Sequence, residues 1–330
     1  DSGDDDDSGD DDDSGDDDDS GDDDDSGDDD DSAPSPADRI VIAGDSWSTG
    51  SVNPTQTALV DLGYGDVTVT WEGTAVAGSQ ASEWVANQDG KLDALAAALD
   101  AEDGADVLLL YLGGNDYNFG LLEGLDGSRS GMEWDDAVDD LLSRTQSDIE
   151  LMVTRSLSGR DDLHIVLVGY SYFHFEWFTG LFGMDLGTSS TLTYNQGMTA
   201  LGARKLDIAG RLDRVHYAHN FGILQHTMGL YPQFPFSLPL VEYPPGFFDP
   251  PSAAPDYDPF PGGVRRKDID PAVIPPESLP GPVEGFDDGI HPSAAGYFVW
   301  SSLIAPVIDD AIAAPRVRHG IVPPFLLERI

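Results

Sequence analysis

Two residues of this sequence, far apart along the chain, are of the types that together carry out acyl transfer. Ser46 stands in the stretch IVIAGDSWSTG (residues 40–50), and His291 stands in FDDGIHPSAAG (residues 286–296). A serine hydroxyl is a weak nucleophile until a base takes its proton, and a histidine can be that base. Asp288 could hold the imidazole in the required tautomer and stabilise its charged form. These three residues are our candidate nucleophile, base and orienting acid.

The tetrahedral intermediate of acyl transfer carries an oxyanion, which needs hydrogen-bond donors fixed in place. Two further stretches, GTAVAGSQAS (73–82) and YLGGNDYNFG (111–120), offer such donors. The candidates are the backbone amides of Ser46 and Gly78 and the side-chain amide of Asn115. Together with the candidate nucleophile and base, they would complete an acyl-transfer site.

Each of these residues also has an ordinary structural interpretation. Asp45 or Ser46 could cap a helix that follows a strand, and Asp288 and His291 could cap the helix that begins at PSAAG. Asn115 could be a turn former after two glycines. Taken singly, the residues favour these structural roles, whereas the combination favours catalysis.

The elements that must position these residues follow from the apolar pattern. We predict strands at Ile40–Ala43, Val67–Trp71, Val107–Leu112, Ile165–Val168 and Val215–Ala218, and helices at Leu92–Leu99, Trp134–Leu157, Leu192–Leu212 and Ser293–Ala313. Strands alternate with helices, which predicts a three-layer α/β domain around a parallel sheet. In such sheets ligands bind at the carboxyl ends of the strands, where Ser46 would lie.

The four stretches resemble the sequence blocks of the SGNH hydrolases, the family also called GDSL esterases and lipases. Residues 44–46 match its Gly-Asp-Ser block, AVAGS with Gly78 matches the second block, residues 113–116 match Gly-x-Asn-Asp, and residues 288–291 match Asp-x-x-His. The blocks occur in the family's order. Trp47 stands where the family often has leucine after the first block, which weakens assignment to a subfamily but removes no catalytic group.

The resemblance implies a flavodoxin-like α/β/α fold and ester hydrolysis through an acyl-enzyme on Ser46, with Asp288 and His291 completing the triad. It implies an oxyanion hole of Ser46, Gly78 and Asn115, and neither a cofactor nor a metal. Gly73, where many members have asparagine, weakens assignment to a subfamily. A general esterase or lipase and a carbohydrate acetyl esterase both remain open, because the fold does not choose between substrates.

The first 32 residues cannot contribute to a folded core. They repeat SGDDDD and hold 21 aspartates, no cation and no apolar side chain. Self-repulsion predicts a disordered linker over residues 1–32, which could bind divalent cations loosely. Residues 33–330 then form one hydrolase domain. A segment rich in proline and aromatic residues interrupts it at about 230–285, and we expect this insertion to be ordered beside His291.

Charge and composition exclude several classes of partner. Without the 21 aspartates of the repeat, 41 acids face 16 Lys and Arg, a formal charge of −25 that would repel nucleic acid and anionic membrane surfaces. No apolar run is long enough to span a membrane. There is no cysteine, and hence no disulfide or thiolate metal site. The acidic spacer is typical of exported proteins, which predicts a secreted or extracytoplasmic protein. The alternative of another class is a non-catalytic acidic surface protein that associates with calcium.

Three other features could bear on function. Ser171 in GYSYF lacks the closing glycine of a Gly-x-Ser-x-Gly nucleophile elbow, and His216 and His219 have no spaced third metal ligand. The aromatic segment 171–184 could line an acyl-chain cleft or a sugar platform, or belong to the core. This segment and the insertion at about 230–285 favour a bulky or apolar acyl ester.

Overall fold

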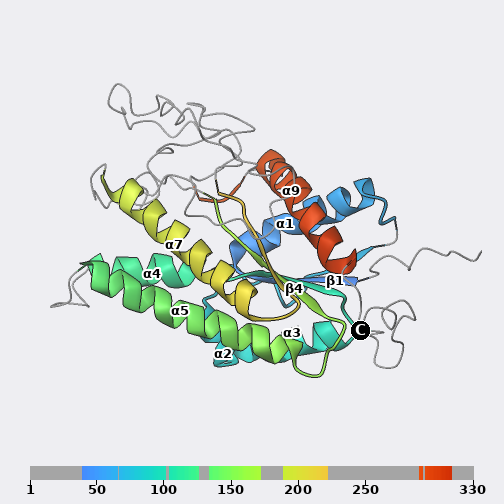
Figure 1. Cartoon of the computed structure of the whole chain (residues 1–330), viewed down its shortest axis with the longest axis horizontal. Helices are drawn as coiled ribbons and strands as arrows, with labels where there is room; N and C mark the ends of the chain where they lie inside the picture. The colour runs from blue at the N-terminus through green and yellow to red at the C-terminus, as the bar shows by residue number, and fades with distance from the viewer. Residues whose placement is uncertain are drawn as a thin grey trace, which may run out of the picture. The chain divides into compact units, whose positions relative to one another are not determined.

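Five parallel strands form a single sheet in the computed structural model of the chain (Figure 1). The structure describes residues 39–65, 67–101, 104–125, 134–171, 189–221, 290–292 and 294–313. The strands are β1 (Arg39–Gly44), β2 (Thr68–Thr70), β3 (Val107–Tyr111), β4 (His164–Val168) and β5 (Val215–Ala218). Their order in the sheet is β2-β1-β3-β4-β5, and every neighbouring pair is parallel. This is the flavodoxin-like order, in which the chain changes direction between β1 and β3.

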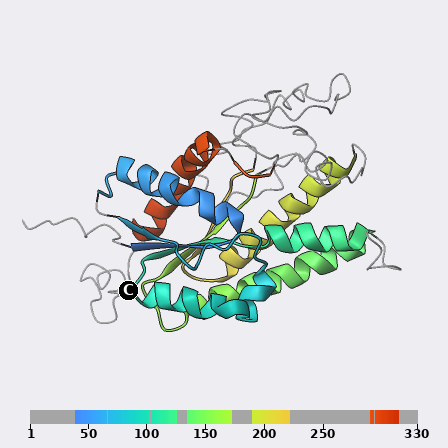
Figure 2. The same cartoon turned by 180° about the vertical axis from the view of Figure 1, so that it is seen from behind.

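Helices cover both faces of the sheet. They are α1 (Ser46–Asp61), α2 (Ala81–Val85), the 3-10 turn η1 (Gln88–Gly90), α3 (Lys91–Asp100), α4 (Gly114–Leu125), α5 (Trp134–Leu157), α7 (Ser189–Arg211) and α9 (Ala294–Ala313). Helices α1 and α9 pack together on one face, and α3, α5 and α7 lie on the other (Figures 1 and 2). The predicted three-layer α/β architecture is therefore confirmed. Within the described residues, no helix is long and apolar enough to cross a membrane.

The central strands are buried on both sides. Every residue of β3 and β4 is buried, as are all of β1 after Arg39, whereas the edge strand β2 is partly exposed. A parallel strand covered by helices on both faces reads as a continuous apolar run rather than as an alternating one. This is why the predicted strands agree with the observed ones closely, with small differences only at their ends.

The sequence pattern also predicted α3, α5, α7 and α9, but it omitted α1, α2 and α4. Helix α1 contains Gly50 and Pro54, which are the two poorest helix formers. Packing against α9 stabilises it instead: Thr55 Oγ1 lies 3.2 Å from Ser301 Oγ. A Cβ atom at position 50 would come within 2.2 Å of the Tyr297 ring, so that glycine is what lets these helices approach. Tertiary packing thus overrides weak local propensity in α1.

Gly44 ends β1 at the point where three segments of chain meet. Its φ is +133°, and a Cβ atom there would lie 1.9 Å from the carbonyl oxygen of Tyr111 on β3. Its N–H donates to the carbonyl of Thr74 at 2.9 Å, and its carbonyl accepts from the N–H of Val76 at 2.8 Å. Only glycine allows β1, β3 and the segment after β2 to come this close. The carboxyl ends of β1, β2 and β3 are therefore neighbours.

Replacing Gly44 with alanine should destabilise the protein more than the same change at Gly63. Gly63 also has a positive φ, +102°, but a Cβ atom there would meet nothing within 4 Å. Gly63→Ala should therefore lower the free energy of unfolding only through backbone strain, by about 1–3 kcal/mol. Gly44→Ala should lower the free energy of unfolding by about 1–3 kcal/mol more, because the backbone of β3 must also move. Equal losses in denaturant unfolding would contradict the close approach.

Candidate active site

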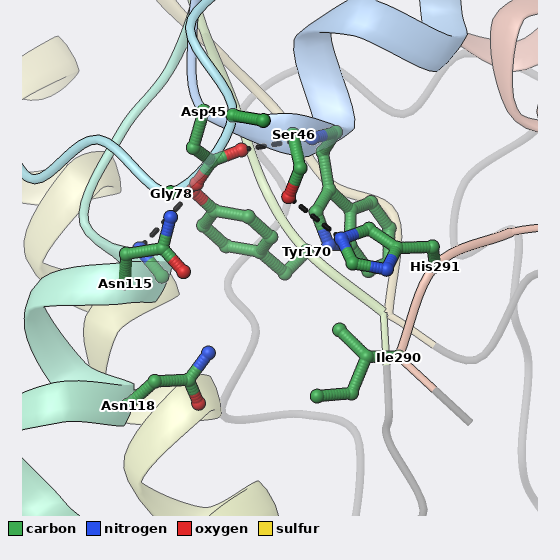
Figure 3. A pocket seen from close by; sticks show the side chains of 11 residues that line it. Asp45, Ser46, Gly78, Asn115, Asn118, Tyr170, Ile290 and His291 are labelled. Carbon is green, nitrogen blue, oxygen red and sulfur yellow. Dashed lines mark hydrogen bonds between the residues drawn. The ribbon is translucent and has the colours of Figure 1, made fainter. Parts of the chain in front are cut away.

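Ser46 and His291 meet at the carboxyl edge of the sheet. Ser46 is the first residue of α1, directly after the turn that follows β1, and His291 precedes α9. The Ser46 Oγ atom lies 2.6 Å from His291 Nε2 (Figure 3). At this distance Nε2 can take the hydroxyl proton, provided that the other ring nitrogen carries a hydrogen. The structure thus brings together the predicted nucleophile and the predicted base.

Asp45 holds the turn that presents Ser46. It is the N-cap residue of α1, and its Oδ1 accepts a hydrogen bond from the backbone N–H of Trp47 at 3.0 Å. Its Oδ2 accepts from the hydroxyl of Tyr170 at 2.5 Å. The structural interpretation of this stretch is therefore correct for Asp45, while Ser46 is left facing the histidine. The N–H of Ser46 belongs to the first turn of α1, whose amides have no acceptor within the helix.

The segment that carries Gly78 is fixed against the end of β1. Ser79, the next residue, donates its hydroxyl to the carbonyl of Gly44 at 3.3 Å and accepts from Trp84 Nε1 at 3.0 Å. Gly78 has a φ of +78°, and a Cβ atom there would meet nothing within 4 Å. Glycine is therefore favoured at position 78 by its conformation, not by crowding. The residue lines the same cavity as Ser46.

Asn115, the second residue of α4, faces this cavity from the end of β3. Its Nδ2 donates to the carbonyl of Ser79 at 3.2 Å, which turns the amide towards the Gly78 segment (Figure 3). Asp116 then ties α4 to α2, because its carboxylate accepts from the N–H of Ala81 at 2.8 Å. Burial raises the pKa of Asp116 to about 6, although hydrogen bonds from backbone amides act in the opposite direction. Among the described residues, the second hydrogen of Asn115 Nδ2 has no partner.

One cavity of about 240 Å³ collects all of these groups. Ser46 and His291 form one side of it, and Gly78 and Asn115 form the side opposite (Figure 3). The other lining residues are Asp45, Trp47, Ala77, Gly114, Asn118, Tyr170 and Ile290. An ester carbonyl placed here could have its carbon at the Ser46 hydroxyl and its oxygen at the donors.

A buried tyrosine lies behind the nucleophile and was not predicted. Tyr170 follows β4, and its hydroxyl donates to Asp45 and accepts from the N–H of Gly114 at 3.1 Å. The Nζ atom of Lys205, on α7, lies 4.4 Å from the centre of the Tyr170 ring and donates to the carbonyl of Val168 at 2.7 Å. The position of Tyr170 just after a strand was the one available signal. Nothing in the helical pattern marks Lys205, which is 1 % exposed, as buried.

Opposite charges in this buried group support one another. Burial raises the pKa of Asp45, and the hydrogen bonds from Tyr170 and from the Trp47 N–H and the charge of Lys205 counteract the rise. Burial lowers the pKa of Lys205, and the nearby carboxylates of Asp45 and Asp116 counteract the fall. A buried charge is costly unless it is paired and hydrogen-bonded. Each ionised form therefore depends on the other.

Several predicted features lie outside the described residues. They are the orienting acid Asp288, the acidic repeat at 1–32, the insertion at about 230–285 and the aromatic segment 171–184 beyond Ser171. Ser171 itself is fully buried and does not line the cavity. It is therefore not placed to act as the alternative nucleophile.

The histidines near β5 are separate from the cavity. His216 Nε2 lies 3.1 Å from His164 Nδ1 on the neighbouring strand, and the two rings are stacked. His219 is fully buried beside Tyr217 and Phe221. In the part of the chain that the structure describes, no three potential metal ligands come together.

Neither a protein-family model nor a curated protein sequence matches the chain. Solved structures do match it. One is the lipase Lip_vut3 from a goat rumen metagenome, with 12 % identity over 83 % of this chain and 96 % of that chain and a TM-score of 0.44. Another is described as a GDSL-like lipase from Parabacteroides merdae, with 10 % identity over 84 % and 96 % and a TM-score of 0.43. A third is a mutant of Axe2, an acetyl-xylooligosaccharide esterase from Geobacillus Stearmophilus, with 12 % identity over 85 % and 96 % and a TM-score of 0.44. All three are described as lipases or esterases.

Replacing Lys205 with methionine should make stability more dependent on pH. Without the ammonium group the pKa of the buried Asp45 carboxyl rises further, so the native state keeps a proton that the unfolded state has lost. Burial raises the pKa of Asp45 to about 6 in the wild type already, so the two proteins should differ in slope only above this pH. Relative to the wild type, the free energy of unfolding should fall as the pH rises from about 6 to about 8. The fall should be about 1.4 kcal/mol for each unit of added pKa. Denaturant unfolding at several pH values measures it.

The control is Arg211→Met, which removes an exposed cation from the same helix. Arg211 pairs with Glu150 and Asp207 at the surface, where water and salt screen the charges. Its stability curve should run parallel to that of the wild type over this pH range. A uniform offset in Lys205→Met, with no added slope, would show that Lys205 does not support the charge of Asp45.

Proposed function

We propose that this protein is a serine esterase that hydrolyses carboxylic esters through an acyl-enzyme on Ser46. The observation that carries the proposal is the 2.6 Å contact between Ser46 Oγ and His291 Nε2. It is supported by the cavity beside this pair, whose opposite wall holds Gly78 and Asn115. A hydroxyl, a base and donors in this arrangement are the groups that ester hydrolysis requires.

In the first half of the reaction, Ser46 Oγ attacks the carbonyl carbon while His291 Nε2 takes its proton. The carbonyl oxygen becomes an oxyanion, which accepts hydrogen bonds from the N–H groups of Ser46 and Gly78 and from Asn115 Nδ2. The tetrahedral intermediate collapses when the bond to the alcohol oxygen breaks. His291 gives its proton to that oxygen, and the acyl group remains on Ser46.

In the second half, a water molecule attacks the acyl-enzyme and His291 takes the water proton. The second intermediate uses the same donors, and its collapse returns the proton to Ser46 Oγ and releases the carboxylic acid. In this proposal Asp288, three residues before His291 in the chain, orients the imidazole and stabilises its charged form. No step needs a metal or an organic cofactor.

The proposal names a class of substrate and not a single compound. A small-molecule or lipid ester is our first proposal, and an acetylated carbohydrate is the alternative within the same chemistry. The alternative of another class remains a non-catalytic acidic surface protein. A protein of that kind would not depend on the Ser46 hydroxyl for any turnover, so the variants below separate these classes.

Ser46→Ala and His291→Ala should each lower kcat by about 10⁶, because nucleophile and base act as a unit. Asp288→Asn should cost less, about 10⁴. A serine-reactive phosphonate should label the wild type once per chain and leave Ser46→Ala unlabelled. The far-ultraviolet circular dichroism of all three variants should match that of the wild type. Inactivation by Ser171→Ala, with Ser46→Ala still active, would show that the nucleophile is wrongly assigned.

Asn115→Ala should lower kcat by about 10²–10³ with little change in KM, because the donor acts where negative charge develops. A residue that only forms a turn would behave differently: its loss would lower the melting temperature and leave the turnover of folded molecules unchanged. The test measures kcat per phosphonate-titrated site alongside thermal unfolding. Full turnover with a lower melting temperature would remove Asn115 from the oxyanion hole.

A further inference from the structure

Asn118 is a second amide on the wall of the cavity, one helical turn beyond Asn115. Residues three apart on a helix lie on the same side, with Cβ atoms about 5–6 Å apart. Both residues line the cavity, and Asn118 is 8 % exposed. The triad and the oxyanion hole described above do not use it. Its side chain therefore requires a separate explanation.

A tyrosine is hydrogen-bonded to the oxygen end of the Asn118 amide. The Tyr194 hydroxyl, on α7, donates to Asn118 Oδ1. Tyr194 is fully buried, and its ring packs against that of Tyr117 with centroids 5.3 Å apart. The oxygen of Asn118 is thus occupied, and the amide nitrogen points into the open space between Asn115 and Ile290 (Figure 3). Among the described residues, Tyr194 is the hydrogen-bond partner of Asn118 Oδ1, and Asn118 Nδ2 has no partner.

We propose that Asn118 selects esters that carry a second, uncharged oxygen acceptor near the scissile carbonyl. The inference rests on the proposed esterase function. With the carbonyl oxygen at Asn115, an ether, hydroxyl or carbonyl oxygen two to four bonds from the carbonyl carbon, on either side of the ester, reaches the Asn118 nitrogen. A plain alkyl chain in the same place would cover that nitrogen without giving it an acceptor, which is unfavourable.

The charges around the cavity argue for an uncharged acceptor. Asp45 lines the cavity, and Asp116 follows Asn115 on the same helix; both carboxyl groups are buried. The nearby cation, Lys205, is already engaged with Val168 and the Tyr170 ring. A negatively charged group on the substrate would therefore be repelled, whereas a neutral oxygen needs only a donor.

The test compares esters that differ by one oxygen in place of one methylene group. On the acyl side the pair is p-nitrophenyl methoxyacetate and p-nitrophenyl butyrate. On the alcohol side it is 2-methoxyethyl acetate and butyl acetate. For each pair the ratio of kcat/KM values is divided by the ratio for hydrolysis by hydroxide, which removes the intrinsic reactivity. We expect the wild type to favour the oxygen-containing member of one pair by about 3- to 10-fold.

The matching variant is the double change Asn118→Leu/Tyr194→Phe. Asn118→Leu alone would take from the buried Tyr194 hydroxyl the acceptor to which it donates, whereas the double change removes both partners of this hydrogen bond and keeps the shape. The preference should vanish in the double variant. It should persist in Asn53→Leu, which makes the same change at an exposed position of α1.

The outcomes separate this inference from the proposed function. A preference in the acyl pair places the acceptor in the acid, and a preference in the alcohol pair places it in the alcohol. No preference in the wild type, or one that persists in the double variant, overturns the role of Asn118. Because the absence of a preference in the wild type would already overturn the inference, the test does not depend on whether the double variant folds. Turnover that Ser46→Ala retains would instead overturn the esterase proposal.

Discussion

The hydroxyl of Tyr170 is the contact on which the geometry of the site depends. It donates to Asp45 at the end of β1, accepts from the N–H of Gly114 at the end of β3, and itself follows β4. A buried carboxylate and a buried amide are thereby satisfied by one group, and leaving either unpaired would cost about 1–3 kcal/mol. Ser46 is the next residue after Asp45, and Asn115 is the next after Gly114. The nucleophile and the donor opposite it are therefore held at a set separation.

The same contact makes the charge of Lys205 necessary. The Asp45 carboxylate is buried and accepts a hydrogen bond from Tyr170. The Lys205 ammonium group lies over the ring of this tyrosine. Asp116, which ties α4 to the start of α2, adds a second buried carboxyl nearby. The cavity thus has the Asp45 carboxylate in its lining and neutral donors on its wall. This arrangement suits a neutral substrate better than an anionic one.

The elements that the sequence pattern missed are those closest to the chemistry. Helices α1 and α4 begin with Ser46 and with Gly114 followed by Asn115, and both contain residues that are poor helix formers. Positions that serve a turn, a close approach or a hydrogen bond to substrate cannot also be chosen for helix propensity. By contrast, α5 and α7 carry no residue of the Ser46, Gly78, Asn115 and His291 set, and their apolar periodicity marked them correctly. The failures of local prediction were therefore concentrated at the site.

The sequence by itself determined the succession of the five strands along the chain and the types of the reactive groups, because buried parallel strands and short motifs are local patterns. It placed Ser46, Gly78 and Asn115 after successive strands, and a parallel sheet necessarily brings such positions to one edge. The tertiary structure alone decided that Ser46 and His291 touch, that Tyr170 and Lys205 lie behind them, and that the nitrogen of Asn118 faces the cavity. Each of these depends on which side of an element is turned inward and on a partner from a distant part of the chain. No local period in the sequence encodes that.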